Sequence, residues 1–339
     1  MTPKISIILP VCHGGRFLNA ALVSLRALAF QRDHFEVIVA GEGDDHESRV
    51  MVESESAVVD YDLGYIAAGS PKRSVKLNAA CSQAKGRILA FADDDCIFNP
   101  DWLDRITIVL DEAEGTGAVG GRDVLEMSES PFDLALDLVL NSFLGAGGMR
   151  RGTAPALGKY YPRLWNMAVP RRVAESVSME GSGGRSLLFN EELAVHEDVE
   201  LMDRIDRAGW RLVFAPDLVI RHRRDTSFNS FVKRNFNMAR ACRSLKIHRT
   251  PHIFLSVLFS CGVLFGAGSI FIPQLRVLFT FLLGLCGMPL ASAGVIGLFR
   301  TGNVFVMFLA PALLCSLYAA RAVGYFFPAQ FNHPERTGK

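Results

Sequence analysis

The chain has 339 residues, half of them hydrophobic, with 36 Lys and Arg against 35 Asp and Glu. The near balance of charge comes from an acidic first part, a basic stretch and a nearly uncharged last part, an order that disfavours a nucleic-acid binder. The length fits one medium-sized domain with an additional part.

The first 120 residues alternate predicted strands and helices. We expect strands over 5–9, 36–40 and 87–91, and helices over 17–28 and 74–84. Gly86 is predicted to stop the second of these helices. The alternation favours an open, mostly parallel α/β sheet, which binds ligands beyond the carboxyl ends of its strands. No GxGxxG or GxxxxGKS/T motif follows a strand, which disfavours a Rossmann dehydrogenase and a P-loop NTPase.

Three consecutive aspartates, Asp93, Asp94 and Asp95, follow the predicted strand over 87–91. Side chains alternate along a strand, so Asp93 and Asp95 are expected to point the same way and to share one cation. Carboxylate oxygens suit Mg²⁺ or Mn²⁺, which take part of their coordination from substrate phosphates. Taken alone, the run fits equally well a solvated acidic loop that caps the following helix.

A second acidic cluster opens a predicted helix that stops at Gly209. Glu197 and Asp198 lie in its first turn, where they either complement the helix dipole or provide a general base beside a phosphate and metal site. A predicted turn and strand over 212–220 leads to His222, which on local grounds is a solvated surface residue. The glycine-rich stretch 181–184 is either a mobile loop over a ligand or a plain connection.

The seven cysteines show no CxxC spacing. Three of them, Cys261, Cys286 and Cys315, lie in strongly apolar runs. The pattern argues against a disulfide framework or a zinc site and fits a reducing compartment.

Charge and hydropathy divide the chain into three parts. Residues 1–220 carry 22 Lys and Arg against 33 Asp and Glu, whereas 221–250 carry nine basic residues and one acidic residue. Apolar runs follow at 252–271, 277–299 and 304–327, each near the roughly 20 residues that cross a bilayer. About three transmembrane helices are therefore predicted, with the basic stretch and the preceding domain on the cytoplasmic side. The alternative is a very apolar soluble helical domain.

The basic stretch has an amphipathic pattern over 227–245, with Phe228 and Phe231 on one face and Lys233 and Arg240 on the other. We predict a helix that lies on anionic lipid, with a solvated basic helix as the alternative. Arg321, near the end of the third apolar run, is expected to reach the lipid headgroups.

The order and spacing of these segments resemble the inverting glycosyltransferases of family 2, which have the nucleotide-sugar-binding GT-A fold. The resemblance covers about residues 4–245. Its segments, in chain order, are 5–11, 42–43, 76–78 before 84–86, 91–95, 166–168 before Arg171 and Arg172, 197–198 before Gly209 and Trp210, and 214–216 before His222.

The resemblance implies a role for each matching residue. In that family an Asp-x-Asp pair binds the metal that bridges the donor diphosphate, which implies Asp95 on Mg²⁺ or Mn²⁺ and Asp93 near the ribose. Asp198 would be the catalytic base, and His222 a further metal ligand. The implied donor-binding residues are Pro10, Val11, Glu42, Lys76, Asp93 and Asp94, and the implied acceptor or loop residues are Trp165, Asn166 and Glu197.

The implied function is transfer of a single sugar, with inversion, from a nucleotide sugar to a lipid-linked or other membrane-associated acceptor in polysaccharide or glycolipid biosynthesis. A UDP-sugar is favoured because Glu42 can accept from N3–H of uracil. The family commonly has Asp-Asp-Gly where this chain has Gly41, Glu42 and Gly43, which leaves other bases open. The Gln-x-x-Arg-Trp motif of processive synthases is absent, which favours single transfer.

The expected organisation is a cytoplasmic GT-A catalytic domain over 1–225, a basic interfacial helix over 226–250, the transmembrane helices over 251–328 and a polar tail over 329–339. The expected partners are a nucleotide sugar, a membrane acceptor and anionic lipid, with no nucleic acid. Two other classes stay open: a nucleotidyltransferase or related sugar-nucleotide enzyme, and a catalytically idle membrane scaffold.

Overall fold

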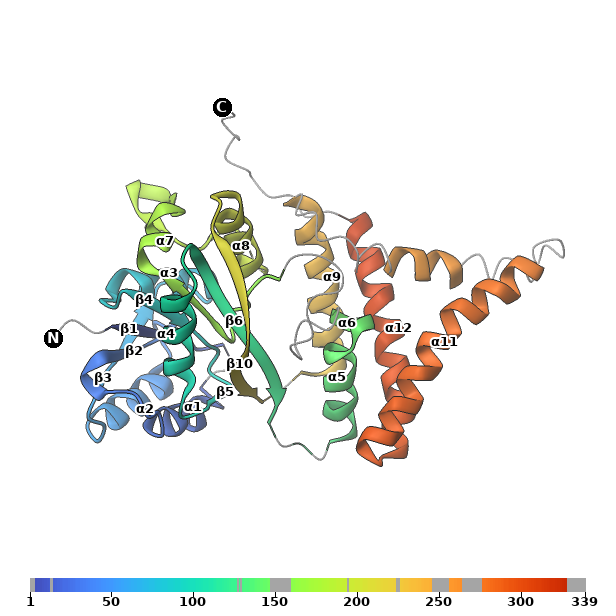
Figure 1. Cartoon of the computed structure of the whole chain (residues 1–339), viewed down its shortest axis with the longest axis horizontal. Helices are drawn as coiled ribbons and strands as arrows, with labels where there is room; N and C mark the ends of the chain where they lie inside the picture. Colours follow the sequence, from blue (N-terminus) through green and yellow to red (C-terminus); the bar gives the residue numbers. More distant parts are fainter. Residues whose placement is uncertain are drawn as a thin grey trace. The chain divides into compact units, whose positions relative to one another are not determined.

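The computed structural model describes residues 4–12, 15–126, 128, 130–146, 160–193, 195–223, 226–245, 256–263 and 276–327 (Figure 1). The chain packs into two compact units. The first comprises Met1–Glu126 and Tyr160–Arg224, and the second comprises Met127–Lys159 and Asp225–Lys339. The described residues 128 and 130–146 thus belong with the C-terminal helices rather than with the first unit, a feature that the sequence analysis did not predict.

The first unit is built on an eight-stranded sheet in the order β3-β2-β1-β4-β7-β6-β10-β5. The strands are β1 Ile5–Pro10, β2 Phe35–Glu42, β3 Asp62–Ala68, β4 Ile88–Phe91, β5 Cys96–Phe98, β6 Thr116–Leu125, β7 Met167–Pro170 and β10 Arg211–His222. The four strands from β3 to β4 are parallel, whereas β7 is antiparallel to both of its neighbours and β5 is antiparallel to β10. The predicted open, mostly parallel α/β sheet is confirmed, and its antiparallel pairs make it a mixed sheet.

Helices flank this sheet. They are α1 Leu18–Arg26, α2 His46–Ser56, α3 Arg73–Gln83, α4 Trp102–Glu112, α7 Arg171–Ser176 and α8 Glu197–Arg207, with a short 3₁₀ turn, η1 Arg32–His34. Every residue of β1 is buried, as expected of a central parallel strand that is covered on both faces. Alternate β1 residues Ile5, Ile7 and Leu9 share one apolar core with residues of α1 and α4.

Most of the predicted elements are present near their expected bounds. The three predicted strands correspond to β1, β2 and β4, and the predicted helices to α1, α3 and α8. Gly209 has φ +86°, a left-handed conformation that ends α8 as predicted.

Gly86 has a different role from the predicted helix stop. The chain leaves α3 at Ala84 in an extended conformation (ψ 135°), so no left-handed cap is needed. A Cβ atom at Gly86 would lie 2.5 Å from the backbone nitrogen of Ser6. Glycine is required at this position because the chain passes directly against β1.

The glycine-rich stretch 181–184 forms the turn of a small hairpin. The 3₁₀ turn η3 (Ser182–Gly184) joins β8 (Met179–Glu180) to β9 (Ser186–Leu187). Gly183 and Gly184 have φ +76° and +72°, which only glycine adopts without strain. The local geometry of the turn accounts for the glycines.

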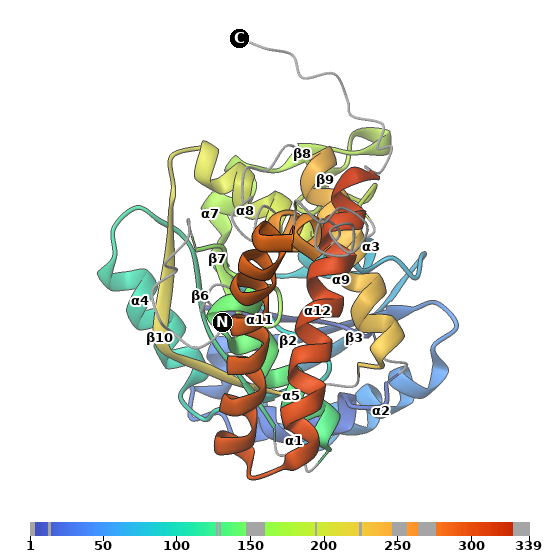
Figure 2. The same cartoon turned by 90° about the vertical axis from the view of Figure 1, so that its right-hand side faces the viewer.

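The second unit consists of helices packed around α12. Its elements are α5 Pro131–Asn141, α6 Phe143–Ala146, α9 Phe228–Ser244, a helix over 256–263, α11 Arg276–Thr301 and α12 Val304–Phe326. Figure 2 shows α11 and α12 side by side, joined by a short turn. These helices share one apolar core. Its buried residues are Ala135, Leu136, Leu138 and Val139 of α5, Phe231 of α9, and Val306, Ala310, Leu313, Leu314, Leu317 and Tyr318 of α12.

The apolar face of α9 packs inside this unit. Phe231, Asn235 and Ala239 are buried, and Phe231 lies in the core with residues of α12. This packing covers the face that the sequence analysis assigned to lipid, while Phe228 remains 47% exposed. The interfacial placement of the helix stays a prediction.

Arg321 does not reach outward, and the expectation that it extends to lipid headgroups is wrong. Its side chain is 5% exposed. Nε donates to Asn235 Oδ1 at 3.2 Å, and Nη1 donates to the Gly145 carbonyl oxygen at 2.9 Å. A buried guanidinium needs such partners, and the close packing of α12 on α9 and α6 supplies them.

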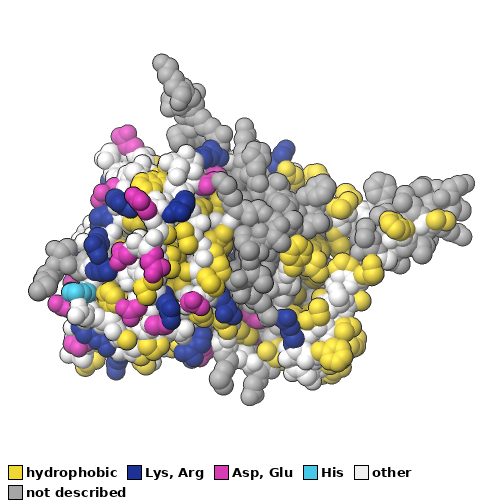
Figure 3. All heavy atoms as spheres, viewed as in Figure 1, with side chains coloured by type: hydrophobic (Ala, Val, Ile, Leu, Met, Phe, Trp, Pro, Cys, Tyr) yellow, Lys and Arg dark blue, Asp and Glu magenta, His cyan; other side chains and the backbone are white. Residues whose placement is uncertain are grey.

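Apolar surface in the second unit is concentrated on α11 and α12. Phe281 and Phe299 of α11 and Phe305 and Phe308 of α12 are exposed, and Figure 3 shows mainly hydrophobic atoms there, in contrast to the charged surface of the first unit. In the described part of the chain, α12 alone is long and apolar enough to cross a membrane. The first predicted span, 252–271, lies outside the described residues except for 256–263, so a multi-pass arrangement is not shown.

Removal of residues 251–339 is expected to cause aggregation. The truncation leaves α5 and α9 without α12, and each apolar side chain so uncovered loses about 1.5–3 kcal/mol of burial free energy. Size-exclusion chromatography of both chains in the same mild detergent tests this, with a chain truncated after Phe327 as the control that keeps α12 and is expected to stay monodisperse. If the chain without residues 251–339 were equally monodisperse, the apolar faces of α5 and α9 would not need α12 to cover them.

Candidate functional site

The three aspartates lie in a turn between β4 and β5, where the alternation of a strand no longer applies. Each of the three side chains has its own partner. Asp93 forms an ion pair with Arg73, and Asp94 Oδ2 accepts from the Cys12 backbone N–H at 3.0 Å. Asp95 Oδ1 lies 2.8 Å from His222 Nε2. Asp94 thus ties the turn to the end of β1.

Asp95, Cys96 and His222 form a buried group whose candidate ligand atoms all lie within 4.8 Å of one another. The antiparallel pairing of β10 with β5 places His222 directly opposite Cys96. His222 Nδ1 also lies 3.5 Å from Asp123 Oδ1. Carboxylate oxygen and imidazole nitrogen are ligands that Mn²⁺ accepts, and the donor set therefore fits a divalent cation.

The electrostatics of this group are those of a charged pair, so a cation that binds there must displace the imidazolium proton of His222. Burial would lower the pKa of His222, but the carboxylates of Asp95 and Asp123 outweigh it and raise the pKa to about 9. Burial raises the pKa of the Cys96 thiol well above its usual value. The sequence analysis named Asp95 and His222 but missed Cys96 and Asp123, which only the sheet pairing brings to the histidine.

Asp198 is fixed in the first turn of α8. Its Oδ2 accepts from Arg163 Nε at 2.7 Å and from the Leu164 backbone N–H at 3.4 Å, while Oδ1 accepts from the Val199 backbone N–H at 2.8 Å. The preceding His196 has φ +67°, a rare conformation for a residue other than glycine. Burial would raise the pKa of Asp198, but Arg163, with His196 and Arg73, lowers it below its usual value.

Arg73, at the start of α3, joins the two acidic clusters. It forms an ion pair with Asp93, and its Nε lies 3.6 Å from Glu197 Oε1. Burial raises the pKa of both carboxyl groups, and the Arg73 charge opposes that rise. The aspartate turn and the start of α8 therefore belong to one site. The sequence offered only one signal for Arg73, its place at the start of a helix that leads into the aspartate strand.

The predicted contacts to the nucleotide base also come together. Lys76 Nζ donates to the Val11 carbonyl oxygen at 2.8 Å and to Glu42 Oε1 at 3.1 Å. Pro10 is the last residue of β1, next to Val11. Pro10, Val11 and Glu42 lie at the carboxyl ends of β1 and β2, the edge where open α/β sheets bind ligands, and Lys76 reaches them from α3.

Trp165 and Asn166 follow Arg163 in a tight turn but have different surroundings. Asn166 is buried, and its amide accepts from Trp102 Nε1 at 2.9 Å and donates to the Arg122 and Leu218 carbonyl oxygens. It holds strands together, and we leave it out of the acceptor site. The Trp165 ring is stacked on the His222 ring, with centroids 6.2 Å apart, and so borders the candidate cation group.

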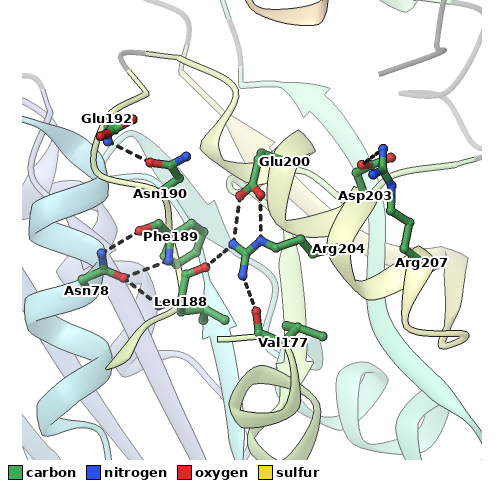
Figure 4. Close-up of polar contacts among 10 residues, drawn as sticks. All are labelled: Asn78, Val177, Leu188, Phe189, Asn190, Glu192, Glu200, Asp203, Arg204 and Arg207. Carbon is green, nitrogen blue, oxygen red and sulfur yellow. Dashed lines mark hydrogen bonds and ion pairs between the residues drawn. The ribbon is translucent and has the colours of Figure 1, made fainter. Parts of the chain in front are cut away.

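A network of polar contacts holds the segment that leads to α8 (Figure 4). Asn78 of α3 accepts from the backbone N–H groups of Leu188 and Phe189 and donates to the Phe189 carbonyl oxygen. Arg204 of α8 pairs with Glu200 and also donates to the Leu188 carbonyl oxygen. Both side chains hold the backbone of Leu188, in the chain segment that precedes Glu197 and Asp198.

Asn78→Ala is expected to lower the free energy of unfolding by about 1–3 kcal/mol, because it leaves buried backbone groups of Leu188 and Phe189 without partners. Denaturant unfolding in detergent and hydrogen exchange at these two amides measure the effect. Asn190→Ala is the control, since Asn190 caps only the exposed Glu192 N–H. Equal losses in the two variants would show that Asn78 does not hold the segment.

Comparison with known proteins identifies the family of the chain. The model of the family described as "Glycosyltransferase like family 2" matches residues 3–241. The chain is 23% identical over 276 residues to glycosyltransferase AglE of Haloferax volcanii, covering 80% of this chain and 82% of the relative. It is 32% identical over 195 residues to the succinoglycan biosynthesis protein ExoM of Rhizobium meliloti, covering 52% of this chain and 62% of the relative.

A solved structure shows the same architecture. The mannosyltransferase PcManGT from Pyrobaculum calidifontis, in complex with GDP-Man and Mn²⁺, superposes with a TM-score of 0.52 at 17% identity, covering 95% of this chain and 87% of that chain. At this identity the likeness concerns the fold, and the predicted GT-A architecture is confirmed. The family match extends over most of the chain and includes the strands and helices that carry the site. The chain belongs to the glycosyltransferase like family 2.

Proposed function

We propose that this glycosyltransferase moves a single sugar, with inversion, from a nucleotide sugar to a membrane-associated acceptor, with Asp198 as the general base. The observation that carries the proposal is the contact of Arg73 with both Asp93 and Glu197. Through it, the turn that carries Asp95 is linked to the helix start that carries Asp198.

The proposed reaction is a single displacement. The acceptor hydroxyl oxygen forms a bond to C1 of the sugar while its proton passes to Asp198. The bond between C1 and the phosphate oxygen breaks, and its electron pair leaves with the nucleoside diphosphate. Because attack and departure occur on opposite faces, the anomeric centre inverts. A general base of this kind contributes roughly 10²–10⁴-fold to the rate.

Asp95 and His222 would hold a divalent cation, Mn²⁺ or Mg²⁺. A bound cation of this kind neutralises charge on the departing diphosphate. The PcManGT structure was obtained with Mn²⁺, which supports the choice of ion. Cys96 stands beside the pair as a neutral thiol.

Donor recognition is assigned to the ends of β1 and β2. Glu42, Lys76 and the Val11 carbonyl would contact the nucleotide base, and Asp93 the ribose. A uracil base suits Glu42, because a carboxylate accepts from N3–H. A guanine nucleotide is a second candidate for the donor, because PcManGT was solved in complex with GDP-Man.

A membrane acceptor is supported by two features of the second unit. Helix α12 is long and apolar enough to span a bilayer, and Phe299, Phe305 and Phe308 are exposed beside it. Basic residues over 221–250 would place the first unit on the cytoplasmic side, where anionic lipid attracts them. A polyprenyl-linked or glycolipid precursor is the acceptor class that such an anchor would bring to the site.

A donor panel tests the proposal. Full-length protein in detergent is incubated with Mn²⁺, a polar lipid extract and, in turn, UDP-glucose, UDP-galactose, UDP-N-acetylglucosamine and GDP-mannose. Release of a nucleoside diphosphate with labelled lipid of inverted anomeric configuration is expected. Release of pyrophosphate would instead identify a nucleotidyltransferase, and no turnover of any donor would leave the scaffold alternative.

A further inference from the structure

We propose that Arg163 is a positioning residue for Asp198, which fixes Oδ2 so that Oδ1 receives the acceptor proton. This inference rests on the proposed role of Asp198 as the base. It concerns a side chain to which neither the sequence pattern nor the family resemblance assigns a role.

The geometry around Asp198 is asymmetric. Both donors from the turn 163–166, Arg163 Nε and the Leu164 N–H, point at Oδ2. Among the described residues, Oδ1 accepts one hydrogen bond, from the Val199 N–H at 2.8 Å, and lies 4.0 Å from His196 Nδ1, beyond hydrogen-bond distance. An ionised carboxylate accepts about four hydrogen bonds, two at each oxygen, so Oδ1 retains capacity for one hydroxyl.

The turn that carries Arg163 is itself rigid. The Asn166 backbone N–H donates to the Arg163 carbonyl oxygen at 2.9 Å, and the Asn166 side chain is held by three further hydrogen bonds. The Arg163 guanidinium lies 5.0 Å from the centroid of the Trp165 ring, a cation–π contact that fixes its direction. The turn and the Trp165 ring therefore hold Arg163 in the orientation that contacts Asp198.

Charge gives Arg163 a second effect on the base. The groups that face Asp198 are Arg163 from the turn, Arg73 from α3, and His196 and Glu197 from its own helix. Arg163 is the largest favourable influence on the ionised form, and burial opposes it. A base must be ionised, so activity is lost as the pH falls through its pKa. Without Arg163 the pKa rises, and the acidic limb of the rate profile moves to higher pH.

The test compares Arg163→Gln, Arg163→Lys and Arg207→Gln. Arg207 is the matched control, because its Nη2 makes a 2.7 Å ion pair with Asp203 in the same helix. For Arg163→Gln we expect kcat to fall about tenfold to a hundredfold, as misplacement of a catalytic group does. Its acidic limb should move to higher pH, while donor KM and the Mn²⁺ dissociation constant stay unchanged.

Arg163→Lys keeps the charge but loses the planar Nε donor. We expect the acidic limb of its rate profile to stay near that of the wild type while kcat is reduced. If Arg163→Gln does not fold, this variant alone tests the positioning role of Arg163. An unchanged profile and kcat in Arg163→Gln would overturn the inference, as would a shifted limb in Arg163→Lys. A rise in donor KM alone would also overturn it and make Arg163 a donor ligand. If Asp198→Asn retains transfer, the proposed function itself fails.

Discussion

Asp198→Asn is expected to reduce kcat by about 10²–10⁴-fold at saturating donor, the usual cost of losing a general base. An amide has nearly the shape of the carboxylate but cannot take the acceptor proton. The affinities for donor and Mn²⁺ should stay close to those of the wild type, because Asp198 contacts Arg163 and backbone groups rather than the candidate cation pair. Initial rates and isothermal titration of donor with Mn²⁺ separate the two effects.

Asp203→Asn is the control for Asp198→Asn, since Asp203 lies on the same helix and pairs with the half-exposed Arg207. We expect no more than a small change in kcat from it. The opposite pattern for Asp198→Asn, lost donor binding with normal turnover of bound donor, would make Asp198 a structural or metal residue. The single-displacement proposal would then have no base and would be withdrawn.

Asp95→Asn is expected to weaken Mn²⁺ binding by at least about 10–100-fold, a loss that removal even of groups around a metal ligand can cause. Its carboxylate is the charged member of the pair with His222, and an amide oxygen carries no charge to balance the cation. Donor binding should fall with metal binding, because metal and diphosphate bind together. Electron paramagnetic resonance of free Mn²⁺ gives metal affinity without any turnover.

Asp111→Asn is the matched control for Asp95→Asn, because the Asp111 side chain is 65% exposed and forms an ion pair with Lys4, outside the candidate site. His222→Gln should weaken Mn²⁺ binding in the same direction as Asp95→Asn. If Mn²⁺ affinity were unchanged in both variants, Asp95 and His222 would be an internal ion pair of the sheet. The cation would then have to be held elsewhere.

Elements with a strong local pattern could be predicted from the sequence. The buried strands β1, β2 and β4 are continuous apolar runs, and α8 begins at acidic residues and ends at Gly209, so each is encoded by neighbours along the chain. The order of these elements was also sufficient to indicate the family and its GT-A fold, which the comparisons confirm. Asp95, Asp198 and His222 were named as candidates on the same basis.

The partners of these candidates were decided by the tertiary structure. His222 meets Cys96 and Asp123 because β10 pairs antiparallel with β5 and parallel with β6, and no local periodicity encodes that register. Arg163 and Arg73 reach the acidic residues across long sequence separations. The burial of Arg321 likewise follows from helix packing that a hydropathy profile cannot show, because the profile records which residues are apolar but not which helices cover them.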